Sequence, residues 1–226
     1  MANNDPPDTT GDPTRAKPRA SSSASDAKRA VSHPHDAFFK KTFSDPRQAA
    51  GELRAVLPQE VSARLDWTSL TLQQGSFVDA ALQWRHTDLL FRVNMLGGHE
   101  GYVFVLFEHQ STPDDLAPFR ILAYMVRIWD RWLEKHPGSK MLPVVIPVVL
   151  YHGRKPWTAP TQLVELFDLP DDLKSVLRLV TPQLGFVLDD LTAQDDEQLQ
   201  RRAMDAMGRL ALLLFKHARH SVDFLQ

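Results

Sequence analysis

The hydrophobic pattern separates a polar N-terminal tail from the rest of the chain. Residues 1–32 carry one large aliphatic side chain after Met1, Val31, among mostly small, polar and charged residues. Such a segment cannot bury enough apolar surface to offset its conformational entropy. We therefore expect residues 1–32 to be a disordered tail and order to begin at about residue 33.

Helical and extended patterns then alternate. The spacing of apolar residues predicts a helix or turn over 38–43, and helices over 46–57, 58–65 and 118–136. Extended patterns cover 65–79, 88–95, 102–110 and 142–153. The last is continuously apolar, as in a central strand, and its Pro147 indicates a bulge or an unpaired position.

The C-terminal third is less regular. We expect short segments over 164–167 and 173–179, a strand over 185–188, and a final amphipathic helix over 197–220. That helix places Met207, Leu210 and Leu214 on one face. Helices, an antiparallel meander, a crossover helix and a further strand together predict an α+β or mixed α/β fold.

Composition narrows the class of protein. The 226 residues carry a net charge of −2, so an anionic partner must be met by a local basic patch. There is no cysteine, which excludes disulfides and thiolate metal sites. The longest apolar run, Met141–Tyr151, is too short and too proline-rich to cross a bilayer. With no secretory signal pattern, we expect a cytoplasmic protein without membrane partners.

Two acids mark the outer ends of the predicted hairpin. If its turn centres on Gly98, Asp88 faces Glu108, Leu90 faces Leu106, and Gln110 shares a face with Glu108. Directly opposed side chains have Cβ atoms roughly 4.5–5.5 Å apart, so two ionised carboxylates there would repel each other.

Several arrangements relieve that repulsion. One acid can hold a proton, or a hard divalent cation such as Mg²⁺ can lie between the two. Alternatively, one acid points to solvent at the strand end, or pairs with Arg92 or Arg120. The pattern alone leaves these alternatives open.

Basic residues follow the hairpin on the predicted helix 118–136. Arg120, Arg127 and Arg131 recur at helical spacing on one face, which suits a phosphate track. A solvated face, partly neutralised by Asp130 and Glu134, explains the same pattern equally well. Lys40 and Lys41 are further candidates for contacting DNA.

Histidines are weaker candidates. We interpret His33 and His35 as an accidental pair, and expect His109 to point away from Asp88. His217 and His220 would need acidic partners, and Asp223 is the one nearby in sequence. His152 either contacts substrate or shapes a turn. Walker, GxSxG and HExxH motifs are missing, which argues against the corresponding hydrolases.

Four blocks of sequence carry a resemblance. They are HDAFFKKTF, SFVDAALQWRHTDLLFRV, FVLFEHQSTPDDLAPFRILAYMVRIWDRWL and LPVVIPVVLYHGRKPW. In this order they resemble the recombination-promoting nuclease (Rpn, YhgA-like transposase) family of the PD-(D/E)XK nuclease superfamily, over about residues 35–215. The resemblance implies a restriction-endonuclease-like core with a central mixed sheet over 33–160, and a mainly helical C-terminal segment over 161–226.

The resemblance also implies roles for individual residues. Asp88 and Glu108 would bind Mg²⁺ (or Mn²⁺ or Ca²⁺), with the backbone carbonyl of His109 as a further ligand. Gln110 stands where a Lys usually orients the attacking water. We expect a DNA endonuclease that acts in recombination or mobile-element transfer, with a homodimer suited to double-strand cuts.

The chain departs from the family pattern in three places. Gln110 carries no charge, Ala80 stands where an acid usually follows Asp79, and Gln226 comes soon after the last predicted helix, so we expect a shortened C-terminal part. The alternative function is a catalytically weak DNA-binding or regulatory module that retains the nuclease fold.

Overall fold

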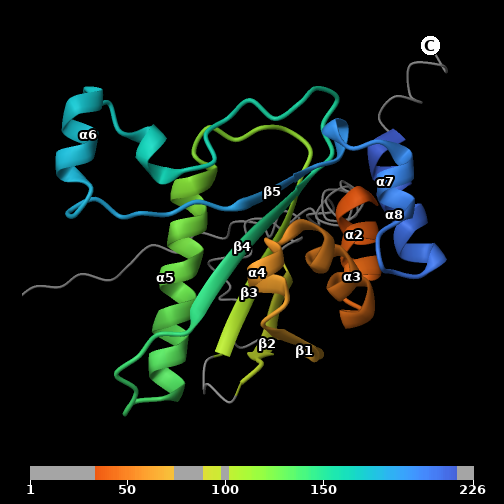
Figure 1. Ribbon diagram of the computed structural model, residues 1–226, viewed down its shortest axis with the longest axis horizontal. Coiled ribbons are helices and arrows are strands. Elements are labelled where there is room, and N and C mark those ends of the chain that lie inside the picture. Colours follow the sequence, from red (N-terminus) through yellow and green to blue (C-terminus); the bar gives the residue numbers. More distant parts are fainter. Residues whose placement is uncertain (1–33, 74–88, 98–101, 218–226) are drawn as a thin grey trace, which may run out of the picture. The chain divides into compact units, whose positions relative to one another are not determined.

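The computed structural model describes residues 34–73, 89–97 and 102–217. Figure 1 labels its elements. The helices are α2 (Pro34–Phe43), α3 (Pro46–Val56), α4 (Gln59–Ser62), α5 (Ala117–Lys135), α6 (Asp171–Leu177), α7 (Asp196–Gln200) and α8 (Ala206–His217), with 3₁₀ turns η2 (Leu163–Leu166) and η3 (Leu191–Ala193). The strands are β1 (Leu65–Leu72), β2 (Leu89–Met95), β3 (Tyr102–Gln110), β4 (Val144–Tyr151) and β5 (Val187–Asp190).

The strands form one mixed sheet in the order β1-β2-β3-β4-β5. β1, β2 and β3 are an antiparallel meander, and the chain enters the hairpin turn after β2 through Gly97, whose φ of 96° favours glycine. Helix α5 then carries the chain to β4, which is parallel to both β3 and β5. The expected mixed α/β fold is confirmed.

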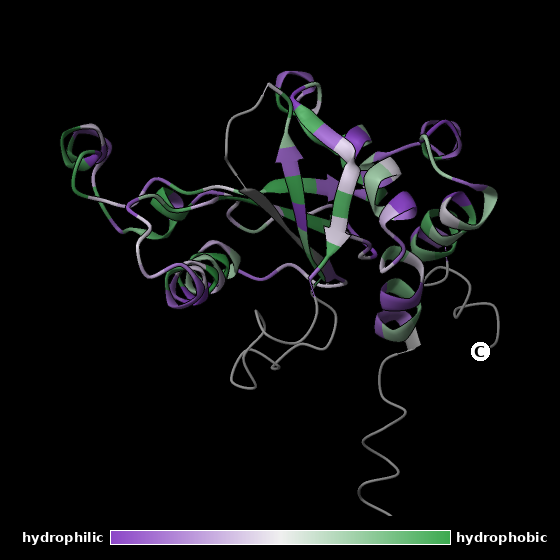
Figure 2. Cartoon of the chain, turned by 90° about the horizontal axis from the view of Figure 1, so that it is seen from below, coloured by the Kyte–Doolittle hydropathy of each residue, from purple (hydrophilic) through white to green (hydrophobic). Residues whose placement is uncertain are grey.

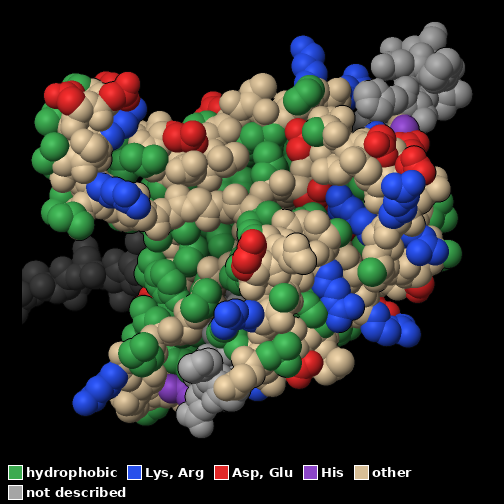
Figure 3. Space-filling model, in the orientation of Figure 1, with side chains coloured by type: hydrophobic (Ala, Val, Ile, Leu, Met, Phe, Trp, Pro, Cys, Tyr) green, Lys and Arg blue, Asp and Glu red, His purple; other side chains and the backbone are tan. Residues whose placement is uncertain are grey.

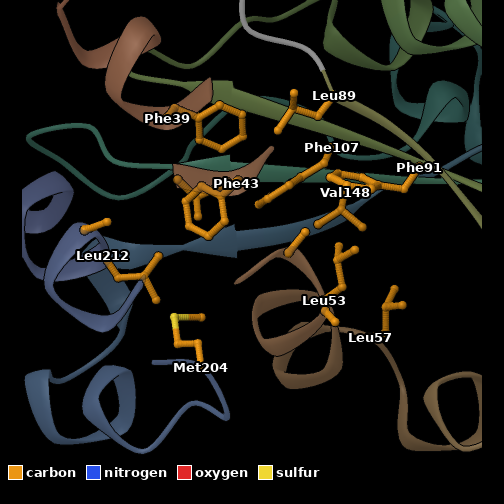
Figure 4. Close-up of a cluster of buried hydrophobic side chains, with 14 of the residues drawn as sticks. Phe39, Phe43, Leu53, Leu57, Leu89, Phe91, Phe107, Val148, Met204 and Leu212 are labelled. Carbon is orange, nitrogen blue, oxygen red and sulfur yellow. The ribbon is translucent and has the colours of Figure 1, made fainter. Parts of the chain in front are cut away.

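Alternating side chains of the sheet supply two apolar faces. Leu89, Phe91 and Val93 of β2 belong to a buried cluster with α2, α3 and α8, whereas Leu90 belongs to a second cluster with α5. Figure 2 shows this layering, with α5 on one side of the sheet and α2, α3 and α8 on the other. Figure 4 shows the larger cluster, in which Phe39 and Leu212 approach the sheet from helices far apart in sequence.

Local sequence signals set several boundaries. Pro46 stands in the first turn of α3, and the Asp45 carboxylate caps that helix by accepting a hydrogen bond from the Arg47 backbone N–H (2.9 Å). The β3–β4 register runs without a break through Pro147, which excludes a bulge there. On its other side β4 pairs with β5 only from Val148 onward, so the proline precedes that ladder.

The predicted single helix over 197–220 is wrong. The chain forms α7 and α8, separated at Arg201–Asp205. Arg202 turns into the core there, and Asp205 caps α8 by accepting hydrogen bonds from the backbone N–H groups of Met207 (2.9 Å) and Gly208 (3.0 Å).

The buried face of α8 is not the one on which the sequence places Met207, Leu210 and Leu214. Met207, Leu210 and Leu214 do share a face, but that face is exposed. The buried residues of α8 are Gly208, Ala211, Leu212 and Phe215. Across the described ranges, no helix is long and apolar enough to span a membrane.

Candidate functional site

The hairpin register is as predicted. Leu90 opposes Leu106 and Arg92 opposes Phe104, and the last described pair at this end is Leu89 with Phe107. Asp88 lies outside the described residues, as does the side chain of Glu108. The Glu108 backbone continues in β3 and pairs with Val149 of β4.

Gln110 ends β3 in a buried position. Its side chain and backbone are 3% exposed, it pairs with Tyr151, and its carbonyl oxygen accepts a hydrogen bond from the His152 N–H (2.9 Å). Tyr151 is fixed in turn, because its hydroxyl donates to the Lys155 carbonyl (2.8 Å). A Cβ on Gly153 would lie 1.8 Å from the Tyr151 hydroxyl oxygen, which explains the glycine in YHG. Gln110 therefore sits on a rigid parallel strand pair.

A group of histidines packs together beside this strand end. The buried rings of His109 and His152 stack at 4.2 Å, and Phe39 stacks on the other side of His109 at 4.8 Å. His35 lies 5.5 Å from His152 between ring centroids. The Asp36 carboxylate lies 3.5 Å from Nδ1 of His109.

Sequence reasoning missed this group. Spacing along the chain does not predict the contact of His35 with His152, because the three histidines come from α2, β3 and the end of β4. The shared signal is a histidine in each of the blocks HPHD, EHQ and YHG. The stack anchors His109, the residue between Glu108 and Gln110, to helix α2.

The predicted basic residues divide between the two sides of the sheet. Arg120, Arg127 and Arg131 lie on α5, whereas Lys40 and Lys41 are exposed at the end of α2, which packs on the opposite face. The structure thus joins the arginines on one helix but does not bring the lysines to them.

Two of the arginines contact nearby acids. Arg120 forms an ion pair with Asp114, and Nε of Arg131 lies 3.9 Å from a carboxylate oxygen of Glu134. The neutralisation expected from Glu134 is therefore present in part. Arg127 is exposed.

A buried ionic network, which the sequence did not suggest, joins strand β5 to α3 and to the segment between α7 and α8. The Arg202 guanidinium donates two hydrogen bonds to the Asp189 carboxylate (2.7 and 2.8 Å) and one to Glu52. All three side chains are buried. Burial, and then the charge of Asp189, raise the pKa of Glu52 well above its ordinary value, although Arg202 opposes the shift. When Glu52 is protonated, the network contains one buried cation, Arg202, and one buried anion, Asp189.

A cavity of about 560 Å³ adjoins this network, and its lining includes Arg54, Gln198, Arg201 and Arg202. None of the residues predicted to act in catalysis or DNA binding lines it. Within the described part of the chain, no cluster of three or more His, Asp or Glu side chains is arranged to hold a metal ion.

His217, at the end of α8, contacts an acid that is distant from it in sequence. Nε2 of His217 lies 2.9 Å from an Asp196 carboxylate oxygen, and Lys216 donates to the same group at 2.6 Å. The hydrogen bond from Lys216, and then that from His217, lower the pKa of Asp196. Asp223 and His220 lie outside the described residues. This ion pair joins the start of α7 to the end of α8, so its role is structural.

Comparison with known proteins gives consistent matches. Residues 33–226 match the family described as "Putative transposase, YhgA-like". The chain is 34% identical over 192 residues to "Recombination-promoting nuclease RpnD" of Escherichia coli O157:H7, covering 84% of this chain and 69% of that protein. It is 32% identical over 194 residues to "Recombination-promoting nuclease RpnA" of E. coli K12, covering 85% and 63%.

A further relative has a different name. The chain is 32% identical over 193 residues to the "Inactive recombination-promoting nuclease-like protein RpnE" of E. coli K12, covering 84% of this chain and 60% of that protein. The chain thus spans between 60% and 69% of the length of these three relatives. No solved structure matches it. Because the family match covers almost all of the chain beyond its polar tail, the chain belongs to the YhgA-like putative transposase family, alongside the Rpn recombination-promoting nucleases.

Proposed function

We propose that this chain is a metal-dependent DNA endonuclease that promotes recombination or mobile-element transfer. The register of the β2–β3 hairpin carries the proposal. Leu89 opposes Phe107. The same register, extended by one residue, would oppose Asp88 with Glu108. The names of the relatives, recombination-promoting nucleases, support a nuclease role.

The proposed metal site uses oxygen ligands at the end of β3. Asp88 and Glu108 would supply carboxylates, and His109 its backbone carbonyl, a ligand set of the hard oxygen type that Mg²⁺ prefers. The bound ion would supply Lewis-acid activation of water and stabilisation of charge on the phosphodiester. The stacking of the His109 ring on Phe39 and His152 supports the proposal, because it fixes the strand that carries Glu108 and the His109 carbonyl.

Gln110 would orient the attacking water. Its amide can both donate and accept hydrogen bonds, and its burial on paired strands restricts its position. It supplies no charge, so charge stabilisation must come from the other groups of the site. The sheet topology, an antiparallel meander followed by a helix and a parallel strand, is the arrangement expected of a PD-(D/E)XK core.

DNA would approach along the basic edge of α5. Arg120, Arg127 and Arg131 would contact backbone phosphates, which carry no sequence information. The ion pairs of Arg120 and Arg131 reduce the local positive potential, so we expect moderate, salt-dependent binding without sequence preference.

Plasmid cleavage with Mg²⁺, Mn²⁺ or Ca²⁺ tests the proposal. The variants are Asp88→Ala and Glu108→Ala, with Asp172→Ala on α6 as an exposed acid control, all checked for native circular dichroism. We expect cleavage by the wild type and the control, and a loss of about 100-fold or more in both site variants. Equal cleavage by all four proteins would reject the site.

The alternative is a DNA-binding or regulatory module without cleavage. It is favoured by the uncharged Gln110 and by the word "inactive" in the name of one relative. A folded wild type that binds DNA in EDTA and cleaves with no metal would support this alternative.

A further inference from the structure

The cavity of about 560 Å³ beside the ionic network is lined by α3, β5 and the segment from Gln194 to Ala203. Its volume falls within the range of small-molecule sites in proteins, roughly 300–1,000 Å³. The charged residues of its lining are Arg54, Arg201, Arg202 and Asp189, so three cations face one anion. Figure 3 shows Lys and Arg side chains gathered over α3, α7 and α8. The cavity therefore suits an anionic ligand.

We propose that this cavity binds a small phosphate ester, a phosphorylated molecule of about nucleotide size. A phosphate monoester carries a charge of about −1.5 to −2 at pH 7, which matches the excess of positive charge in the lining. Guanidinium groups suit phosphate because their planar N–H donors can bind two of its oxygens at once. The half-buried side chains of Val56 and Leu188 give the organic part of the ligand an apolar surface.

Arg54 is the cation most available to a ligand. It is exposed on α3, and its guanidinium carbon lies 5.4 Å from the centroid of the Trp67 ring. Among the residues that the structure describes, no carboxylate forms an ion pair with it. The aromatic ring orients the guanidinium without neutralising its charge. Arg54 can therefore bind a phosphate without giving up an existing ion pair.

The other two arginines of the lining already contact acids. Arg201 pairs with Glu197, but the two side chains are 73% and 71% exposed, and such pairs are weak because water screens them. Arg202 uses three of its five guanidinium N–H groups to bind Asp189 and Glu52, which hold it in a fixed position. A phosphate would replace Glu197 as the partner of Arg201 and would use the remaining N–H groups of Arg202.

The walls of the cavity are held by internal contacts. Asp195 and Gln198 form a capping box at the start of α7, in which each side chain accepts a hydrogen bond from the other residue's backbone N–H (2.6 and 3.1 Å). On the opposite wall, Gly51 packs so closely on the segment after α7 that a Cβ there would lie 2.5 Å from the Ala203 carbonyl oxygen. A cavity with fixed walls loses little conformational entropy when a ligand binds.

The cavity is separate from the proposed catalytic site. Phe107 and His109 of β3 contact Phe39 of α2, on the side of the sheet where α3 also packs. Side chains alternate along a strand, so Gln110 lies on the other side. Ligand binding in the cavity can be measured without DNA or metal. It therefore stands or fails independently of the proposed nuclease activity.

Isothermal titration calorimetry and thermal melts of the full chain at low ionic strength test the proposal. The probes are thymidine monophosphate, inorganic phosphate and thymidine, which has no phosphate. We expect thymidine monophosphate to bind and to raise the melting temperature as its concentration rises, inorganic phosphate to bind more weakly, and thymidine not to bind. Equal binding of thymidine and its monophosphate would overturn the charge argument.

Substitutions at exposed positions locate the site without disturbing the core. Arg54→Gln should weaken binding of thymidine monophosphate by about 10-fold or more, because it removes a charge-assisted hydrogen bond. Arg178→Gln, at an exposed arginine that follows α6, is the matched control and should leave binding unchanged.

A charge pair at Ala55, an exposed position of α3 in the cavity lining, completes the test. Ala55→Glu should abolish binding, whereas Ala55→Lys should retain it, because the two side chains are similar in length and opposite in charge. Unchanged binding in both Arg54→Gln and Ala55→Glu would overturn the proposal. So would a folded wild type that binds neither phosphate probe at concentrations up to about 10 mM.

Discussion

Replacing Arg202 by Met should strongly destabilise the fold, because the substitution leaves a buried carboxylate without its cation. Arg202 donates two hydrogen bonds to Asp189 and one to Glu52, and the Asp189 side chain has almost no contact with solvent. Breaking a buried ion pair from one side costs about 3–5 kcal/mol. With a urea m-value of about 2 kcal/mol/M, the unfolding midpoint should fall by roughly 1.5–2.5 M.

Two control substitutions separate burial from charge. Arg201→Met, one residue earlier, removes an exposed arginine paired with Glu197 and should cost at most about 1 kcal/mol. Glu52→Gln keeps a side-chain oxygen that can accept the Arg202 hydrogen bond and should cost about 1 kcal/mol or less at a pH below the folded pKa of Glu52. If Arg202→Met and Arg201→Met unfold at the same urea concentration, the network does not stabilise the fold as argued.

The same experiment has a pH dependence of known sign. The raised pKa of Glu52 means that its contribution to stability is complete below its unfolded pKa of about 4.3 and declines as pH rises through the folded pKa. Glu52→Gln should remove that decline. A wild type and a Glu52→Gln variant with parallel stability–pH curves would contradict a raised pKa.

Two further predictions concern α8 and its contact with α7. Phe215→Ala should lower the free energy of unfolding in urea by about 3–5 kcal/mol, because Phe215 is fully buried against α2. Leu214→Ala, on the exposed face, should lower it by less than about 1 kcal/mol. Similar losses in the two variants would show that the buried face of α8 is misassigned. Asp196 has a lowered pKa, so its contribution to stability is present above its unfolded pKa of about 3.9 and lost as pH falls. Wild type and Asp196→Asn should therefore converge in thermal melts at low pH, and a difference that persists there would refute the ion pair.

The hairpin was predictable because its information is local. Alternation of side chains along each strand and glycines at the turn define one register, and Leu90–Leu106 and Arg92–Phe104 confirm it. Pro46 and Pro118 likewise mark the first turns of α3 and α5, since proline fits where backbone N–H groups have no helical partner.

The candidate site was predictable only along β3. EHQ places Gln110 two residues after Glu108 in any strand. The stack of His109 on His152 and the approach of Asp36 required α2 to cross that strand end, which no local spacing encodes. The site stays a prediction at Asp88 and at the Glu108 side chain.

The sequence by itself determined the mixed fold, the hairpin register and the family, because periodicity, turn residues and motifs are properties of short segments. The tertiary structure alone decided which apolar face of α8 is buried, where the last helix divides, and which charges meet inside. Leu210 and Leu212 are equally apolar, and only the packing against α2 and the sheet selects Leu212. Glu52 and Arg202 are 150 residues apart, so their pairing arises only when α3 and the segment between α7 and α8 pack against the same sheet.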